Sequence, residues 1–173
     1  MHIAYTSTAG RGDMDLLLSS VAQEIMARGY RACGAVQVNS ETCGHGKCDM
    51  DVQILPDGQI FRISQSLGTG SRGCRLDTAG LETAVGHVAT RLQDGADLLI
   101  VNKFGKQEAA GRGFRPIIAD ALMADIPVLV GLNALNKPAF LEFVGDEAVS
   151  VAPEKDALID WFEKVRDQIG RAA

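Results

Sequence analysis

Eight residues near the amino terminus have the spacing of a phosphate-binding loop. The pattern G-x-x-x-x-G-K-[ST] follows a strand and opens a helix, and residues 7–14 read S-T-A-G-R-G-D-M. Gly12 is the last glycine of the pattern, whereas Ser7 replaces the first. Asp13 stands in place of the lysine, and Met14 in place of the hydroxyl that binds magnesium. Because a carboxylate repels a triphosphate, the sequence predicts a nucleotide-binding scaffold without its usual mechanism.

The backbone of this loop keeps a means of binding anions. N–H groups at the start of a helix form a concave site that attracts negative charge without any lysine. We therefore predict that a ligand contacts Thr8, Ala9, Gly10, Arg11, Gly12 and Asp13. The alternative is that Asp13 caps its own helix and that the loop binds nothing.

Basic residues gather in two later glycine-rich segments, residues 67–75 and 102–115. The second segment directly follows an apolar run at 98–101, and ligands of open α/β sheets bind beyond the carboxyl ends of the strands. Guanidinium and ammonium groups bind oxyanions. We therefore predict further ligand contacts from Arg72, Arg75, Asn102, Lys103, Lys106 and Arg112. The alternative is a pair of solvated surface loops.

The elements that position these residues alternate between strands and helices. Apolar periodicity predicts strands at 2–6, 32–38, 97–101, 126–132 and 149–151, and helices at 13–28, 77–93, 116–124 and 153–169. Residues 50–55 and 59–64 flank a Pro-Asp-Gly turn and predict a β-hairpin, while 104–114 is predicted to be a loop. Helical crossovers between strands favour an α/β fold with a mainly parallel sheet and a β-hairpin insert.

Composition limits the function classes. The chain has 173 residues, which predicts a single domain spanning 1–173, with 46% hydrophobic and 23% charged residues. The net charge of -5 argues against nucleic acid as a partner, so any anion site must be a local basic cluster. We find no secretory leader and no membrane-length apolar run, and therefore expect a cytoplasmic protein without membrane insertion. The sequence leaves open whether the chain forms a homodimer.

The loop at 6–16 and the order of elements resemble the small P-loop nucleoside-triphosphatases first described in thermophiles. The resemblance implies a three-layer P-loop sandwich. In that family an Asp-Glu pair ends the apolar strand, and Asn102 and Lys103 take its place here. Phosphoryl transfer needs lysine, metal and positioned water together, so magnesium is disfavoured as a cofactor. We hypothesise that Lys103 supplies the missing positive charge, because we expect its strand to end beside the first strand. Glu108 keeps a family position and is expected to orient Lys106.

Three stretches are more specific: N-K-F-G-K-Q-E-A at 102–109, C-R-L-D at 74–77 and R-G-D-M-D at 11–15. They are similar to a bacterial family known as domain of unknown function 2478. Members of that family are associated with molybdenum uptake or molybdoenzymes, so the resemblance implies a link to molybdenum metabolism.

The cysteines offer a minor metal-binding hypothesis. Cys43, His45 and Cys48 form a C-x-H-x-x-C pattern, and Cys74 would be a fourth ligand for a soft metal. The spacing is not that of a zinc finger, so incidental reduced thiols are favoured. Within the hypothesis Cys48 and Cys74 are the better pair, because the resemblance covers both. Cys33 is expected in the core.

These observations favour a P-loop-fold binding or regulatory protein for a small anionic ligand, without ordinary triphosphate hydrolysis. The ligand would be a nucleotide or another oxyanion. The alternative is a divergent nucleoside triphosphatase or phosphotransferase that uses Lys103 or Lys106. A third, minor hypothesis is a metal-handling protein that uses Cys48 and Cys74. The sequence does not name the ligand.

Overall fold

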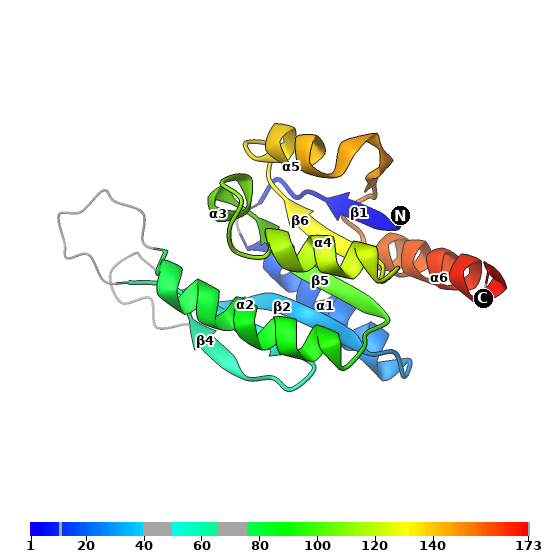
Figure 1. The fold of residues 1–173 in the computed structure, drawn as a ribbon, viewed down its shortest axis with the longest axis horizontal. Coiled ribbons are helices and arrows are strands. Elements are labelled where there is room, and N and C mark those ends of the chain that lie inside the picture. Colours follow the sequence, from blue (N-terminus) through cyan, green and yellow to red (C-terminus); the bar gives the residue numbers. More distant parts are fainter. Residues whose placement is uncertain (11, 40–49, 66–75, 173) are drawn as a thin grey trace.

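The computed structural model describes residues 1–10, 12–39, 50–65 and 76–172, and strands and helices alternate along most of it (Figure 1). The strands are β1 (Ile3–Thr6), β2 (Ala32–Asn39), β3 (Met50–Leu55), β4 (Ile60–Arg62), β5 (Leu98–Phe104), β6 (Val128–Leu132) and β7 (Val149–Ser150). The helices are α1 (Asp13–Ala27), α2 (Thr78–Gln93), α3 (Lys106–Ala109), α4 (Arg115–Met123), α5 (Lys137–Val144) and α6 (Lys155–Ala172), with a 3-10 turn at Gly145–Glu147.

The described strands form one seven-stranded sheet in the order β4-β3-β2-β5-β6-β1-β7. β2, β5, β6, β1 and β7 run parallel, whereas β3 and β4 form an antiparallel hairpin at one edge. The predicted α/β fold with a mainly parallel sheet and a hairpin insert is therefore confirmed. One expectation was wrong: β6 lies between β1 and β5, so the strand that carries Lys103 does not end beside the first strand.

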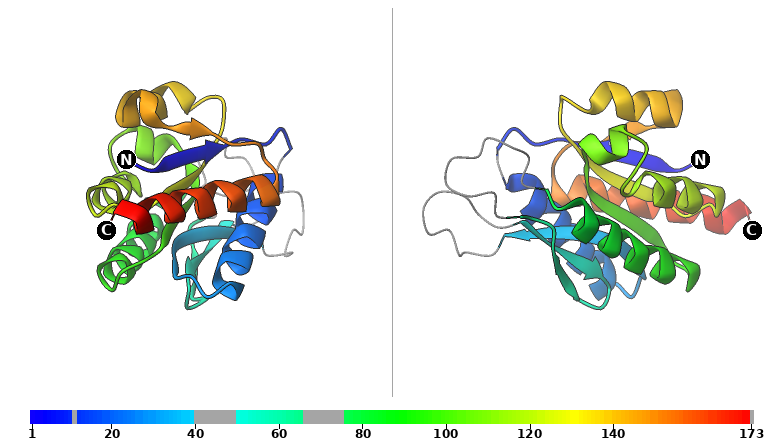
Figure 2. Two further views of the ribbon diagram at one scale, coloured as in Figure 1. Left: turned by 90° about the vertical axis from the view of Figure 1, so that its right-hand side faces the viewer. Right: turned by 60° about the vertical axis from the view of Figure 1, so that its left-hand side comes forward.

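Helices cover both faces of the sheet (Figure 2). On one face, α1 and α6 bury side chains against the sheet, among them Leu18, Ile25 and Phe162. On the other face, α2, α4 and α5 cover a second core, which includes Val88, Ile118 and Phe140. Parallel strands buried on both faces read as continuous apolar runs, which is why the runs at β5 and β6 were recognisable in the sequence.

Local sequence signals set the ends of the longer helices. Asp77 caps α2 by accepting hydrogen bonds from the backbone N–H groups of Ala79 and Gly80. Gly29 follows α1 with φ +87°, a conformation that favours glycine. Two short helices were not predicted. α3 lies within the segment expected to be a loop, and α5 begins at a lysine-proline pair.

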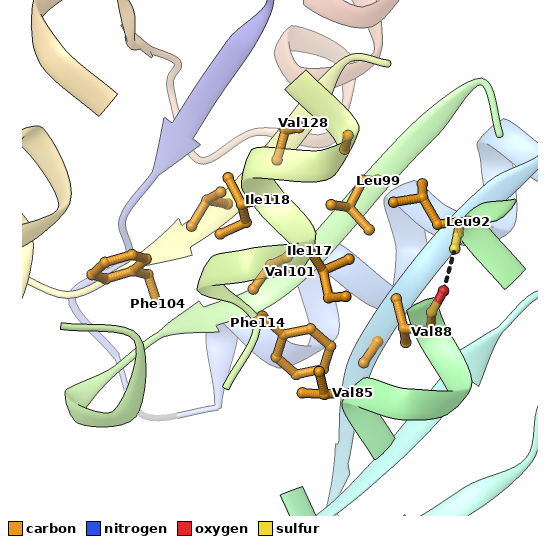
Figure 3. Close-up of a cluster of buried hydrophobic side chains, with 14 of the residues drawn as sticks. Val85, Val88, Leu92, Leu99, Val101, Phe104, Phe114, Ile117, Ile118 and Val128 are labelled. Atoms are coloured by element: carbon orange, nitrogen blue, oxygen red, sulfur yellow. Dashed lines mark hydrogen bonds between the residues drawn. The ribbon is translucent and has the colours of Figure 1, made fainter. Parts of the chain in front are cut away.

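Figure 3 shows part of the core on the α2 face of the sheet, with Val85, Val88 and Leu92 labelled. Cys33 belongs to the same core. Its thiol donates a hydrogen bond to the carbonyl oxygen of Val88 at 3.7 Å. Burial raises the pKa of the Cys33 thiol to about 11. Cys33 is thus a core residue, as expected, and its thiol is unreactive at neutral pH because the thiolate is the reactive form.

Candidate functional site

The carboxyl ends of β1, β5 and β6 meet at one edge of the sheet, where an open α/β sheet binds its ligands. Turns that leave this edge within the described residues lead from β1 into α1, from β5 into α3 and from β6 towards α5. Most of the site residues predicted from the sequence and described by the structure belong to the first two turns. The Ser7 hydroxyl donates to the carbonyl oxygen of Leu132 at 2.6 Å, which ties the first turn to the end of β6.

The turn after β1 has the backbone of a phosphate-binding loop but contains its own carboxylate. Gly12 has φ +83° and precedes the first helical residue, Asp13. A Cβ atom built on Gly10 would overlap Asp13 Oδ2, so the carboxylate lies directly against Gly10. Among the described residues, no side chain caps the start of α1 and no hydrogen bond to Asp13 is seen. The alternative in which Asp13 caps its own helix is therefore wrong.

A buried polar pair lies beneath this turn. The Asn102 side-chain amide donates to Asp15 Oδ1 at 2.8 Å, and both side chains are buried. The bond joins the first turn of α1 to the end of β5. Gly131 of β6 lies between the two elements, where a Cβ atom would overlap the carbonyl oxygen of Asn102 and crowd Leu18.

The residues at the places that the resemblance assigns to magnesium do not suit that ion. Met14 is buried among the apolar side chains between α1 and the sheet, and its thioether cannot replace a hydroxyl as a ligand for a hard cation. Asn102 presents an amide N–H to Asp15 and not a second carboxylate. Across the described ranges, no group of three or more His, Cys, Asp or Glu side chains is arranged to hold a metal.

A cavity of about 420 Å³ opens beside the ends of β2 and β5. Its walls are largely apolar, with Val52, Leu81 and Phe114 among them, and its polar lining is rich in side-chain amides and carries two lysines. The full lining comprises Ala35, Gln37, Met50, Val52, Ile63, Leu76, Leu81, Asn102, Lys103, Gly105, Lys106, Gln107, Glu108, Phe114, Asn133 and Asn136. A volume of this size, apolar walls and a few polar groups are typical of small-molecule sites.

Glu108 organises the turn after β5. Its carboxylate is buried and accepts hydrogen bonds from the backbone N–H groups of Gly105 at 2.8 Å and Phe114 at 3.0 Å. Glu108 itself lies in the first turn of α3. Glu108 therefore fixes the backbone of the turn, and the expectation that it orients Lys106 was wrong. Lys103 and Lys106 are exposed, and neither forms an ion pair within the described part of the chain.

The predicted site residues fall into separate groups. Asn102, Lys103 and Lys106 line the 420 Å³ cavity, whereas the described part of the first turn (Thr8, Ala9, Gly10, Gly12 and Asp13) does not. Arg112 lines a different cavity of about 560 Å³ between the start of α2 and residues 107–116, together with Glu82. The remaining predicted residues, Arg11, Arg72, Arg75, Cys48 and Cys74, lie outside the described residues.

Several cavity residues were missed from the sequence. Asn133 directly follows the buried strand β6, and Asn136 lies one turn later, where its backbone N–H donates to Asn133 Oδ1 at 2.9 Å. Attention to polar residues immediately after each buried strand would have found Asn133. Gln37 and Phe114 carried no such signal, because their place in the cavity depends on the packing of the hairpin and of α4.

Comparison with known proteins places the chain in a family. The profile described as "Protein of unknown function (DUF2478)" matches residues 3–161. The chain belongs to this family. The resemblance to domain of unknown function 2478 is thereby confirmed, and the DUF2478 match runs from β1 into the first part of α6.

A curated relative of this DUF2478 chain is "Molybdenum import ATP-binding protein ModC 2" of Bradyrhizobium diazoefficiens. It is 35% identical over 159 residues, which amount to 92% of this chain but only 18% of the relative. The chain thus spans less than a fifth of that protein's length.

Two solved structures share the fold. The crystal structure of THEP1 from the hyperthermophile Aquifex aeolicus superposes with a TM-score of 0.59 at 17% identity, covering 95% of this chain and 96% of that one. The solution structure of a human cancer-related nucleoside triphosphatase gives a TM-score of 0.57 at 16% identity, with 99% and 96% covered. The DUF2478 chain therefore shares the fold of these two proteins. Among the helices formed by the described residues, none has the length and apolar character to span a bilayer.

Proposed function

We propose that this DUF2478 chain binds a small ligand bearing an oxyanion, such as a nucleotide, at the carboxyl edge of its sheet, without ordinary triphosphate hydrolysis. The observation that carries the proposal is the 420 Å³ cavity, because it combines an apolar interior with two exposed lysines at the edge where this fold binds ligands. The described lining contains two ammonium groups and one carboxylate, that of Glu108, whose oxygens already accept hydrogen bonds from backbone N–H groups.

The lining suits both halves of a nucleotide. The apolar walls offer a surface for a base, and the side-chain amides of Gln107, Asn133 and Asn136 offer neutral hydrogen-bond donors and acceptors. Lys103 and Lys106 offer positive charge for an oxyanion. The net charge of the chain is -5, so this local pair of cations is the feature that would attract an anion.

The absence of ordinary hydrolysis is inferred from the side chains where catalysis would occur. Asp13 stands where the fold usually places a phosphate-binding lysine, and Met14 is buried in the core. Phosphoryl transfer relies on cationic and metal-ion stabilisation of the transferring group. Replacing those groups with a carboxylate and a thioether removes that stabilisation.

A link to molybdenum metabolism is the finer part of the proposal. It is supported by the likeness to a protein named as a molybdenum import ATP-binding protein, of which this chain matches 18%. Molybdate is a tetrahedral oxyanion, and the two lysines present a charge that such an ion would bind. Molybdate therefore belongs among the ligands to be tested.

Calorimetric titration tests the proposal with AMP, ATP, inorganic phosphate and molybdate, each up to millimolar concentration. We expect binding of at least one, weakened roughly tenfold by Lys103→Ala or Lys106→Ala through loss of a charge-assisted contact. The matched control is Lys164→Ala, an exposed lysine on α6 at the opposite face of the sheet, which should bind like the natural chain. Absence of binding by all four ligands would reject the proposal.

The second candidate is a divergent nucleoside triphosphatase or phosphotransferase, favoured by the fact that Lys103 and Lys106 line the same cavity. It predicts phosphate release from a nucleoside triphosphate with magnesium, and loss of that release in Lys103→Ala or Lys106→Ala. Release that is unchanged in both variants removes this role. Metal binding by Cys48 and Cys74 stays a prediction, which metal analysis of untagged protein would test.

A further inference from the structure

We propose that Asp13 makes the site selective for a ligand with one compact oxyanion, such as a nucleoside monophosphate or a free tetrahedral ion, over one with a polyphosphate tail. This inference rests on the proposed function, because it concerns which ligands the same edge of the sheet admits. It assigns Asp13 the role of a specificity-determining residue in the turn after β1.

The first step is the position of the carboxylate. Asp13 Oδ2 occupies the space that a side chain on Gly10 would need, so the carboxylate lies against the backbone of the turn. Gly12 is the last residue before the helix, at φ +83°, and no side-chain cap covers the start of α1. The concave face that a phosphate would occupy in such a turn therefore already has a negative group beside it.

The second step is the path between the cavity and this turn. Asn102 lines the 420 Å³ cavity and also donates to Asp15, two residues beyond Asp13 in the first turn of α1. The Ser7 hydroxyl holds the same turn against the end of β6. A ligand whose oxyanion rests on Lys103 or Lys106 would stay within the cavity, whereas a longer anionic tail that continued towards α1 would approach the Asp13 carboxylate.

The third step is the balance of charge along that path. Among the described residues, the cavity contributes two lysines, whereas the start of α1 contributes the exposed carboxylate of Asp13; Asp15 is buried and bonded to Asn102. Like charges a few ångströms apart near a protein surface repel strongly. The terminal phosphates of a polyphosphate would meet this repulsion, whereas a single oxyanion held at the lysines would not.

The shared chemistry of the admitted ligands is one tetrahedral oxyanion, either attached to a nucleoside or free. Calorimetric titrations with AMP, ATP, inorganic phosphate and molybdate distinguish these sources. AMP binding that is much tighter than phosphate binding identifies a nucleotide ligand, and tight molybdate binding without AMP binding identifies the free ion. Either result is consistent with selection against a polyphosphate.

The decisive comparison uses Asp13→Asn, which keeps the size of the side chain and removes its charge. In the natural chain we expect a compact oxyanion to bind more tightly than ATP. In Asp13→Asn we expect the affinity for ATP to rise by roughly tenfold or more, with the affinity for AMP, phosphate and molybdate changed by about twofold or less. Asp13→Lys should raise the affinity for ATP further.

The matched control is Asp156→Asn, which removes an exposed carboxylate from the first turn of another helix, α6, and alters the net charge equally. It should change the affinity for ATP by less than about twofold. Circular dichroism and thermal unfolding of each variant verify that it is folded.

The outcomes separate the two proposals. Tighter binding of ATP than of every compact oxyanion by the natural chain, or an equal gain for ATP and AMP in Asp13→Asn, overturns the role of Asp13 while leaving the ligand site intact. Failure of every ligand to bind, in the natural chain and in Asp13→Lys, overturns the proposed function and this inference together.

Discussion

The turns after β1 and β5 leave the same edge of the sheet, and each places a carboxylate beside glycines, yet the two carboxylates have opposite surroundings. Glu108 is 3% exposed and accepts hydrogen bonds from two backbone N–H groups. Asp13 is exposed and lies against Gly10, with no hydrogen bond to it among the described residues. The comparison indicates that the Glu108 carboxylate stabilises the fold, whereas we expect the Asp13 carboxylate to act mainly on a bound ligand.

The difference also explains how such a scaffold can alter its chemistry without losing its fold. Within the described ranges the Asp13 side chain makes no hydrogen bond or ion pair, so we expect its replacement to leave the fold unchanged. Glu108 is at a position where a change would leave two backbone donors buried and unpaired. A buried hydrogen bond from Asn102 to Asp15 joins β5 to the first turn of α1, and thus links the elements on which the two turns are built.

The largest difference in stability is expected between variants that truncate Glu108 and Asp13. Glu108→Ala should lower the free energy of unfolding by about 3–4 kcal/mol, because it removes the acceptor for the N–H groups of Gly105 and Phe114. Asp13→Ala should change it by less than about 0.5 kcal/mol. Denaturant unfolding followed by circular dichroism measures both. Similar losses in the two variants would contradict the distinction between the turns.

The buried tie between the turns gives the next largest effect. Asn102→Asp would place a second carboxylate against Asp15 and should lower the free energy of unfolding at pH 7 by about 2–3 kcal/mol. Mutual repulsion raises the pKa of such a pair in the folded state above its unfolded value. The variant should therefore be closest to the natural chain in stability below about pH 4 and lose stability as the pH rises through the folded pKa.

Asn102→Ala serves as the control for that pH dependence, because it removes the donor without adding a charge. We expect a loss of about 1–2 kcal/mol that varies much less with pH. Denaturant unfolding at pH 4 and pH 7 compares the two variants. If Asn102→Asp were as stable as the natural chain at pH 7, the two side chains would not be held together in solution.

Sequence patterns were informative wherever structure is decided locally. The apolar runs at β5 and β6 and the Pro-Asp-Gly turn of the hairpin each act over a few residues, and each was recognised. The order of strands is decided by which crossovers pack together across the sheet. For that reason nothing in the runs themselves revealed that β6 separates β1 from β5.

The candidate site was only partly accessible to sequence reasoning for the same reason. Lys103 and Lys106 were found because they follow a buried strand, whereas Gln37 enters the cavity from a different strand. The turn containing α3 looked like a loop because a helix of four residues is too short to show helical periodicity. Its backbone is held by the hydrogen bonds that the N–H groups of Gly105 and Phe114 donate to Glu108. A motif match placed Asp13 in its turn, but only coordinates show the carboxylate lying against Gly10.

Two glycines of the segment after β5, Gly111 and Gly113, test whether the Glu108 side chain lies where the structure places it. Gly113 has φ +61°, and a Cβ atom there would overlap Glu108 Oε1, so Gly113→Ala should lower the free energy of unfolding by about 2 kcal/mol or more. Gly111 also has a positive φ, of +84°, but has open space around it, so Gly111→Ala should cost about 1 kcal/mol. Equal losses by denaturant unfolding would mean that Glu108 does not occupy the space beside Gly113.

A small effect is also expected in the turn after β1, which the Ser7 hydroxyl ties to the end of β6. Ser7→Ala removes the hydroxyl that donates to the Leu132 carbonyl oxygen and should lower the free energy of unfolding by about 1 kcal/mol. Ser7→Thr keeps the hydroxyl and should lose less. The loss in Ser7→Ala should stay well below that in Glu108→Ala, because Ser7→Ala breaks one partly buried bond, whereas Glu108→Ala breaks one buried and one partly buried bond. A loss as large as that of Glu108→Ala would show that the turn after β1 contributes as much to the stability of the fold as the turn after β5. Asp13 could then no longer be assumed to have no effect on stability.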